Sequence, residues 1–233
     1  NIEVPNINHF PAQGSSGGPI GLLNVDFIQD VNFYTGGFSS MYGDKLSSIL
    51  DVTFREGNRE EIDVQAELSF AGVGAVAEGP LLSKNGSWLI SARRSYVDLL
   101  LNAVGAKGVA VRYGDYQGKF VYDLNPDNTM TLVAISGYDH SDADKDHGEI
   151  IYGSNNVWEN TVGLNWRSLW GKGGYSNTSL AYTSTEYRDD FYETGTDMYF
   201  IRNRSLERTV SLRNVNYARL NETQRVQFGV EAK

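Results

Sequence analysis

The stretch Leu23–Asn58, LNVDFIQDVNFYTGGFSSMYGDKLSSILDVTFREGN, divides the chain into two parts of different character. Asn24 is suited to cap a short helix over residues 25–30, because an Asn side chain accepts a hydrogen bond from a first-turn N–H. Residues 31–35 then alternate as a strand that ends at a Gly-Gly pair suited to positive φ. Residues 49–55 alternate as another strand. The stretch therefore predicts short strands joined by tight glycine turns, and residues 1–5 read as one more short strand ahead of it.

From Glu61 onward the chain becomes a series of period-two alternations. In the first of them Ile62, Val64, Ala66 and Leu68 share one face and polar residues fill the other. About eight strands of this kind are predicted. Short connections at 82–86, 125–128, 171–174 and 221–223 alternate with long ones at 97–111, 139–156 and 188–203. That asymmetry is typical of outer-membrane barrels, which have tight periplasmic turns and long extracellular loops.

Composition narrows the function classes. The net charge of −9, without a basic face, excludes nucleic-acid binding. The N-terminus has no signal-peptide pattern, and no apolar run approaches the ~20 residues of a membrane helix. The absence of Cys removes disulfide and thiolate chemistry. The chain opens and closes within strand-like sequence, so we expect it to be a fragment of a longer polypeptide.

The order of elements in the first quarter resembles the C-terminal half of the plug domain of TonB-dependent outer-membrane receptors. The motif residues are Gly36, Gly37, Tyr42, Gly43 and Asp51, the last in the hydrophobic strand that closes the plug. Many members carry a second glycine pair before that strand, where this chain has two serines. This departure is similar to a SusC-like or related subgroup of large receptors, and it affects the expected substrate class rather than the fold.

The resemblance implies a mostly β chain with two parts. Residues 1–58 would form the C-terminal part of a plug, and residues 59–233 the first strands of an antiparallel transmembrane barrel of about 22 strands. It further implies uptake of a siderophore, glycan, peptide or vitamin across the outer membrane of a Gram-negative bacterium. The implied partners are outer-membrane lipid, an extracellular substrate, the inner-membrane TonB protein, whose contact segment is not in this chain, and a surface lipoprotein.

Two arginines are candidates for a contact between plug and barrel. Arg93 and Arg94 stand near the extracellular end of the second predicted strand, and the alternation directs Arg93 inward. An inward Arg can pair with the plug carboxylates Asp30, Asp44 or Asp51. The alternative is a solvated charge in the lumen.

No other segment of the sequence predicts a catalytic, cofactor or metal site. The acidic loop 139–149, with His140 and His147, offers oxygen ligands for Ca²⁺ or nitrogen ligands for a transition metal, but a solvated acidic loop is the commoner case. No nucleophile has a matched base, so neither catalytic residues nor a cofactor are predicted. Two other function classes remain open: a small structural or adhesive outer-membrane barrel, and a soluble all-β binding module.

Overall fold

The computed structural model confirms that the chain is mostly β, with antiparallel sheets. It describes residues 2–15, 17–39, 41–43, 47–69, 72–82, 84–98, 103, 105, 109–145, 150–171 and 173–233. Within these ranges, no helix is long and apolar enough to cross a membrane.

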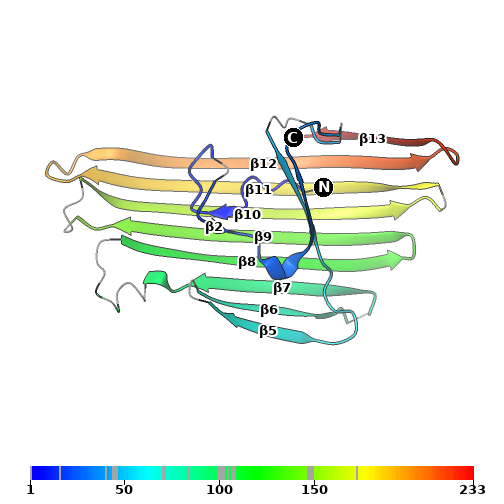
Figure 1. Ribbon diagram of the computed structural model, residues 1–233, viewed down its shortest axis with the longest axis horizontal. Helices are drawn as coiled ribbons and strands as arrows, with labels where there is room; N and C mark the ends of the chain where they lie inside the picture. Colours follow the sequence, from blue (N-terminus) through cyan, green and yellow to red (C-terminus); the bar gives the residue numbers. More distant parts are fainter. Residues whose placement is uncertain are drawn as a thin grey trace.

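One nine-stranded sheet holds most of the chain (Figure 1). Its strands follow one another in chain order, and every neighbouring pair is antiparallel. They are β5 (Asp63–Leu68), β6 (Gly72–Pro80), β7 (Gly86–Ser95), β8 (Val109–Asn125), β9 (Asn128–Ala143), β10 (Ile151–Leu169), β11 (Gly174–Glu193), β12 (Tyr199–Arg219) and β13 (Arg225–Ala232). β5 and β13 are the two edge strands.

The N-terminal segment, residues 2–58, forms smaller elements. These are β1 (Asn8–His9), β2 (Ile20–Gly21), the 3-10 helix η1 (Val25–Phe27), β3 (Ile28–Tyr34) and β4 (Ile49–Phe54). Asn24 caps η1 by accepting a hydrogen bond of 2.9 Å from the backbone N–H of Asp26. The helix is shorter than predicted because the chain turns extended at Ile28 and pairs with β4. The strand predicted over residues 1–5 is wrong, since the first pairing begins at Asn8.

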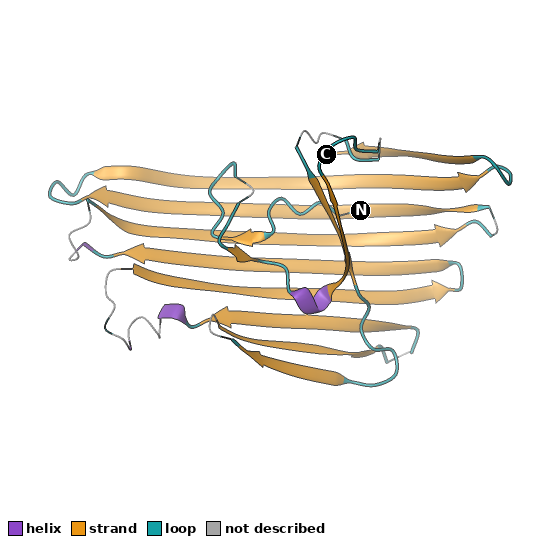
Figure 2. Ribbon diagram, in the orientation of Figure 1, coloured by secondary structure: helices purple, strands orange, loops and turns teal. Residues whose placement is uncertain are grey.

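The N-terminal segment crosses one face of the large sheet, and the β3–β4 ribbon runs steeply across the strands of that sheet (Figures 1 and 2). A small apolar core joins the two parts. Phe27 of η1 is fully buried against Val76 of β6 and Leu89 of β7. Phe54 at the end of β4 packs edge-on against Phe27, with ring centroids 5.7 Å apart.

The two faces of the sheet differ in chemistry. The face that the segment covers, here called the inner face, buries polar side chains such as Ser91, Asp115, Gln117, Asp139 and Glu159. On the opposite, outer face, cross-strand partners form apolar rows. One row reads Trp88, Phe120, Leu132, Leu164, Leu180 and Leu212, and the next reads Ile90, Gly118, Ala134, Val162, Tyr182 and Val210. Most of these side chains are exposed.

Aromatic residues border the apolar rows. Toward the short turns lie Tyr122 and Trp166, and toward the opposite ends of the strands lie Tyr138 and Trp158, whose ring centroids are 5.5 Å apart. The row before this second border is polar and runs through Ser136, Asn160, Ser184 and Arg208. In it, Ser136 donates a hydrogen bond of 2.8 Å to Asn160. The path from Trp158 to Trp166 covers roughly 27 Å of strand, so the two borders enclose an apolar band of that length measured along the strand.

The predicted long connection 97–111 agrees closely with the structure, whereas those at 139–156 and 188–203 are wrong in extent. Strand pairing continues through most of them, so β9 runs to Ala143, β10 begins at Ile151, β11 runs to Glu193 and β12 begins at Tyr199. The connections at that end of the sheet are 69–71, 96–108, 144–150 and 194–198. At the other end they are 81–85, 126–127, 170–173 and 220–224. We call these the loop end and the turn end.

Candidate functional site

A buried histidine joins the N-terminal segment to the sheet. His9 of β1 is fully buried, and both of its ring nitrogens face carboxylates of the inner face. Nδ1 lies 2.6 Å from Oδ1 of Asp139 on β9, and Nε2 lies 3.2 Å from Oδ2 of Asp115 on β8. A carboxylate oxygen only accepts, so both contacts are hydrogen bonds only when both nitrogens carry protons. The geometry therefore fits the imidazolium form.

The pKa of His9 is raised from its ordinary value by these partners. Burial alone acts in the opposite direction, because it disfavours the charged ring. The hydrogen bonds to Asp115 and Asp139, together with their negative charges, outweigh that effect. The segment thus depends on a protonated His9 for this contact.

Asp139 also holds the backbone that follows His9. Its Oδ2 accepts a hydrogen bond of 2.7 Å from the N–H of Phe10. Phe10 has a φ of 57°, a left-handed conformation that bulky residues rarely adopt. The rings of His9 and Phe10 both pack on Tyr113 of β8. One carboxylate thus fixes a side chain and a strained turn together.

Arg93 and Gln117 extend the same network along the segment. The Arg93 Nε donates to both oxygens of Asp115, at 2.9 and 3.1 Å. Its Nη2 donates to the carbonyl oxygens of Leu22, at 2.6 Å, and Gly21, at 3.1 Å. Gln117 donates to the Leu22 carbonyl at 2.8 Å and accepts from the N–H of Asn24 at 3.2 Å. Backbone groups of residues 21–24 are therefore satisfied by the sheet.

A second ionic contact holds the end of β4. Arg55 makes two hydrogen bonds, of 2.7 and 2.8 Å, to the carboxylate of Glu78 on β6, and its Nε donates to the Asp26 carbonyl at 2.6 Å. The bidentate bond to Glu78 raises the pKa of Arg55 despite partial burial. Glu78 also accepts a bond of 2.7 Å from the N–H of Asn58. Close by, Lys119 of β8 donates to the Phe54 carbonyl at 2.6 Å.

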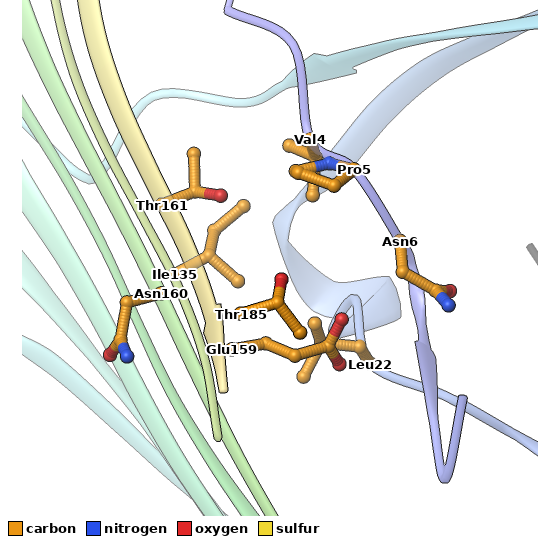
Figure 3. Close-up of a pocket in the computed structure, with 9 residues that line it drawn as sticks. All are labelled: Val4, Pro5, Asn6, Leu22, Ile135, Glu159, Asn160, Thr161 and Thr185. Carbon is orange, nitrogen blue, oxygen red and sulfur yellow. The ribbon is translucent and has the colours of Figure 1, made fainter. Parts of the chain in front are cut away.

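A small cavity lies beside the His9 network. Its volume is about 10 Å³, close to the space that one water molecule occupies. Figure 3 shows the Glu159 carboxylate directed toward Leu22, close to Thr185. The Oε2 atom of Glu159 is buried and has no hydrogen-bond partner within the described residues. Val4, Pro5 and Asn6 close the cavity from the segment side.

The two predicted arginines separate in the structure. Arg93 lies on the inner face and contacts the N-terminal segment, whereas Arg94 follows it on the outer face, since side chains alternate along a strand. The carboxylate that pairs with Arg93 is Asp115 of the sheet, in place of Asp30 or Asp51 of the segment. Asp44 lies outside the described residues.

The residues of the resemblance motif gather around the turn between β3 and β4. Gly36 and Gly37 follow β3 with φ of 153° and 62°. The Tyr42 hydroxyl donates to Oδ2 of Asp51 at 2.9 Å. Burial, followed by the hydrogen bond and charge of Asp51, raises the pKa of Tyr42 to about 12. Gly43 directly follows Tyr42, and a Cβ at Gly43 would meet open space.

Part of the predicted acidic loop 139–149 lies in β9, which runs to Ala143, and residues 146–149 lie outside the described residues. Asp139 faces inward onto His9, and His140 faces outward, with bonds of 2.7 Å to Asn156 and 2.5 Å to Asp142. His147 lies outside the described residues. Within the part of the chain that the structure describes, no group of three or more His, Cys, Asp or Glu side chains could hold a metal ion.

Sequence reasoning missed His9, Asp115 and Asp139 as partners. The available signal was the polar inner face of β8 and β9, where a carboxylate in mid-strand needs a partner once it is covered. That signal does not name His9, which lies 106 and 130 residues away along the chain.

Comparisons with protein-family models, with curated proteins and with solved structures found no match to this chain.

Proposed function

We propose that this chain is part of a TonB-dependent outer-membrane receptor, with residues 1–58 in the plug and residues 59–233 in the barrel wall. The proposal rests on the distribution of side chains over the two faces of the sheet, which is the reverse of that in a soluble protein. Its apolar rows are exposed, and its polar face is covered by the N-terminal segment. A soluble β module buries its apolar face and exposes its polar one. Hydrocarbon outside and a polar interior favour the opposite pattern.

The edges of the sheet support a large barrel. In lipid every backbone N–H and C=O needs a partner, so the edges of β5 and β13 require further strands. A barrel of about eight strands fills its lumen with side chains and leaves no room for a segment on the inner face. A plugged barrel of about 22 strands accommodates both features.

The contact between segment and sheet suits a plug that is held and can be displaced. Apart from the cluster around Phe27, it consists mainly of ion pairs and hydrogen bonds centred on His9, Arg93 and Arg55. Water entering the interface replaces such bonds more readily than it replaces apolar packing. Substrate capture, TonB-driven movement of the plug and release into the periplasm are then the function, with a siderophore, glycan, peptide or vitamin as the substrate.

Single cysteines test the membrane placement. The chain contains no Cys, so Leu164→Cys and Asn165→Cys place a nitroxide label on the outer and inner face of one strand. In proteoliposomes we expect collisions with oxygen at position 164 and with a polar nickel chelate at position 165. A label at position 164 that collides mainly with the nickel chelate contradicts the proposal.

A third cysteine tests plug movement. Leu22 is 1% exposed beneath the segment, so Leu22→Cys reacts with a maleimide only after the segment leaves the sheet. In cells we expect faster labelling with an intact proton-motive force than after addition of a protonophore. Glu222→Cys, in the exposed connection between β12 and β13, serves as the control that labels equally in both. Equal labelling of Leu22→Cys in both conditions contradicts energised movement.

A further inference from the structure

Arginines gather on the outer face at the loop end of the sheet. The alternation of side chains places them there: Arg94 on β7, Arg112 on β8, Arg188 on β11, and Arg202, Arg204 and Arg208 on β12. The matching rows at the turn end carry no charge among the described strand residues. They consist of Tyr122, Met130, Trp166, Thr178 and Asn214, followed by Asn128, Ser168, Ser176 and Asn216. The outer face is therefore cationic at one end only.

Two of these arginines lie directly opposite one another. Arg188 and Arg204 are cross-strand partners of β11 and β12, an arrangement that is unfavourable for like charges. Each is bonded to one carboxylate, Arg188 to Glu186 and Arg204 to Asp190. Their side chains remain 52% and 45% exposed. Arg202, the cross-strand partner of Asp190, adds a further positive charge beside them.

Arg188, Arg202 and Arg204 stand just beyond the aromatic border, whereas Arg94 lies in the border row and Arg208 lies one row inside it. The Arg188 guanidinium lies 5.1 Å from the centroid of the Trp158 ring, and Trp158 in turn packs on Tyr138. In a membrane protein such an aromatic border lies at the level of the lipid headgroups. This step rests on the proposed function, which places the apolar rows in hydrocarbon. The guanidinium groups then stand at the depth of lipid phosphates.

We propose that Arg188 and Arg204, flanked by Arg202, bind the phosphate of a lipid in the leaflet at the loop end. A guanidinium offers paired N–H donors that match two phosphate oxygens, and a phosphate between the two arginines removes their mutual repulsion. The acyl chains of the same lipid lie along the outer face below, over Leu206 and Val210, which are both exposed. An anionic head above an apolar tail complements both parts of this surface.

The test uses the intact polypeptide that contains this chain, in phosphatidylcholine nanodiscs, with bisphosphorylated lipid A as the probe. Dephosphorylated lipid A, which has the same acyl chains, is the matched ligand control. Native mass spectrometry measures the retained lipid. We expect retention of the phosphorylated form and a loss of roughly fivefold in affinity for each arginine changed in R188Q/R204Q. The control variant R219Q/R225Q removes another directly opposed pair, at the turn end, and leaves binding unchanged.

Three outcomes overturn the lipid site. They are equal retention of dephosphorylated lipid A, unchanged binding by R188Q/R204Q, and displacement of lipid A by an equal concentration of inorganic phosphate, which would assign the arginines to a free anion. In each of them the chain is inserted, so the proposed function stands. Failure of the intact polypeptide to enter nanodiscs overturns both proposals together.

Discussion

His9 concentrates the pH dependence of the contact between segment and sheet. A group whose pKa is raised on folding stabilises the folded state below its unfolded pKa, near 6.5 for His, and this stabilisation disappears as the pH rises through the folded pKa. Deprotonation also removes the hydrogen bond from His9 to one buried carboxylate, Asp115 or Asp139. The segment is therefore held more tightly in mildly acidic than in alkaline solution.

His9→Gln is expected to release the segment and to flatten this pH profile. Glutamine donates to one carboxylate at a time, so the change costs about 3 kcal/mol of attachment. Pulse proteolysis of residues 2–58 across the pH range measures it. His140→Gln is the control, because His140 faces outward and contacts Asn156 and Asp142. A His9→Gln protein that keeps the pH profile of the wild type contradicts the assignment.

Gly57 permits the close approach of the segment to β7. A Cβ at this position would meet the carbonyl oxygen of Trp88, a backbone atom that cannot rotate away. Gly57→Ala is therefore expected to weaken attachment by about 1–3 kcal/mol, as measured by the urea concentration that frees the segment. Gly43→Ala is the matched control, because its Cβ meets open space. Equal midpoints for the two variants would show that the backbone accommodates the methyl group.

At the scale of elements, Arg55, directly after β4, bonds to Glu78 of β6 in a geometry that lysine does not reproduce. Arg55 contacts two oxygens of Glu78 and one carbonyl of Asp26, and a single ammonium does not match that planar fork. Arg55→Lys is expected to destabilise the docking of β4 by about 1–2 kcal/mol, since the pair is partly exposed.

A double-mutant cycle with Glu78→Gln measures the coupling between the two side chains. The readout is the same release of residues 2–58 by protease. If the cycle gives no coupling energy, the ion pair contributes nothing to docking, and the Phe27 cluster and the Lys119 bond to the Phe54 carbonyl hold β4 on the sheet.

The elements also show what sequence predicts well. The alternation of apolar and polar residues is a local property of a strand. The strands of the large sheet and the Asn24-capped turn were therefore predictable from short stretches of sequence. The ends of β9 to β12 were not, because residues such as 188–190 and 202–204 are polar on both faces and give no alternation of hydrophobicity. Backbone pairing alone extends those strands.

At the scale of the molecule, the docking of the N-terminal segment on the sheet could not be predicted from the sequence. The sequence indicates that Asp115, Gln117 and Lys119 share a polar face, but their partners belong to a segment about 60 to 110 residues earlier. No local pattern encodes that pairing. The inward direction of Arg93 was predictable, whereas its bonds to backbone carbonyls depend on the path of residues 21 and 22.

The proposed membrane placement of the outer face leads to a prediction that depends on depth in the bilayer. Leu164 lies in the middle of the apolar rows, and Ser154 lies beyond the aromatic border on the same face of the same strand. An arginine on the lipid face costs about 2–4 kcal/mol at the bilayer midplane and about 0–1 kcal/mol near the interface. Leu164→Arg is therefore expected to reduce insertion strongly, and Ser154→Arg, whose cross-strand partners are Asp142 and Asp190, to leave it nearly unchanged.

Reversible folding into phosphatidylcholine vesicles, followed by urea titration, measures both free energies. The relative free-energy costs of the two substitutions distinguish between the possible environments of this face. In water both substitutions add a solvated charge to an exposed position and have similar small effects. Under a covering protein domain, the cost would follow packing instead of depth. A graded series through Val162 and Asn160 that rises toward the middle of the apolar rows is expected only for lipid, because only the bilayer imposes a cost that depends on depth alone.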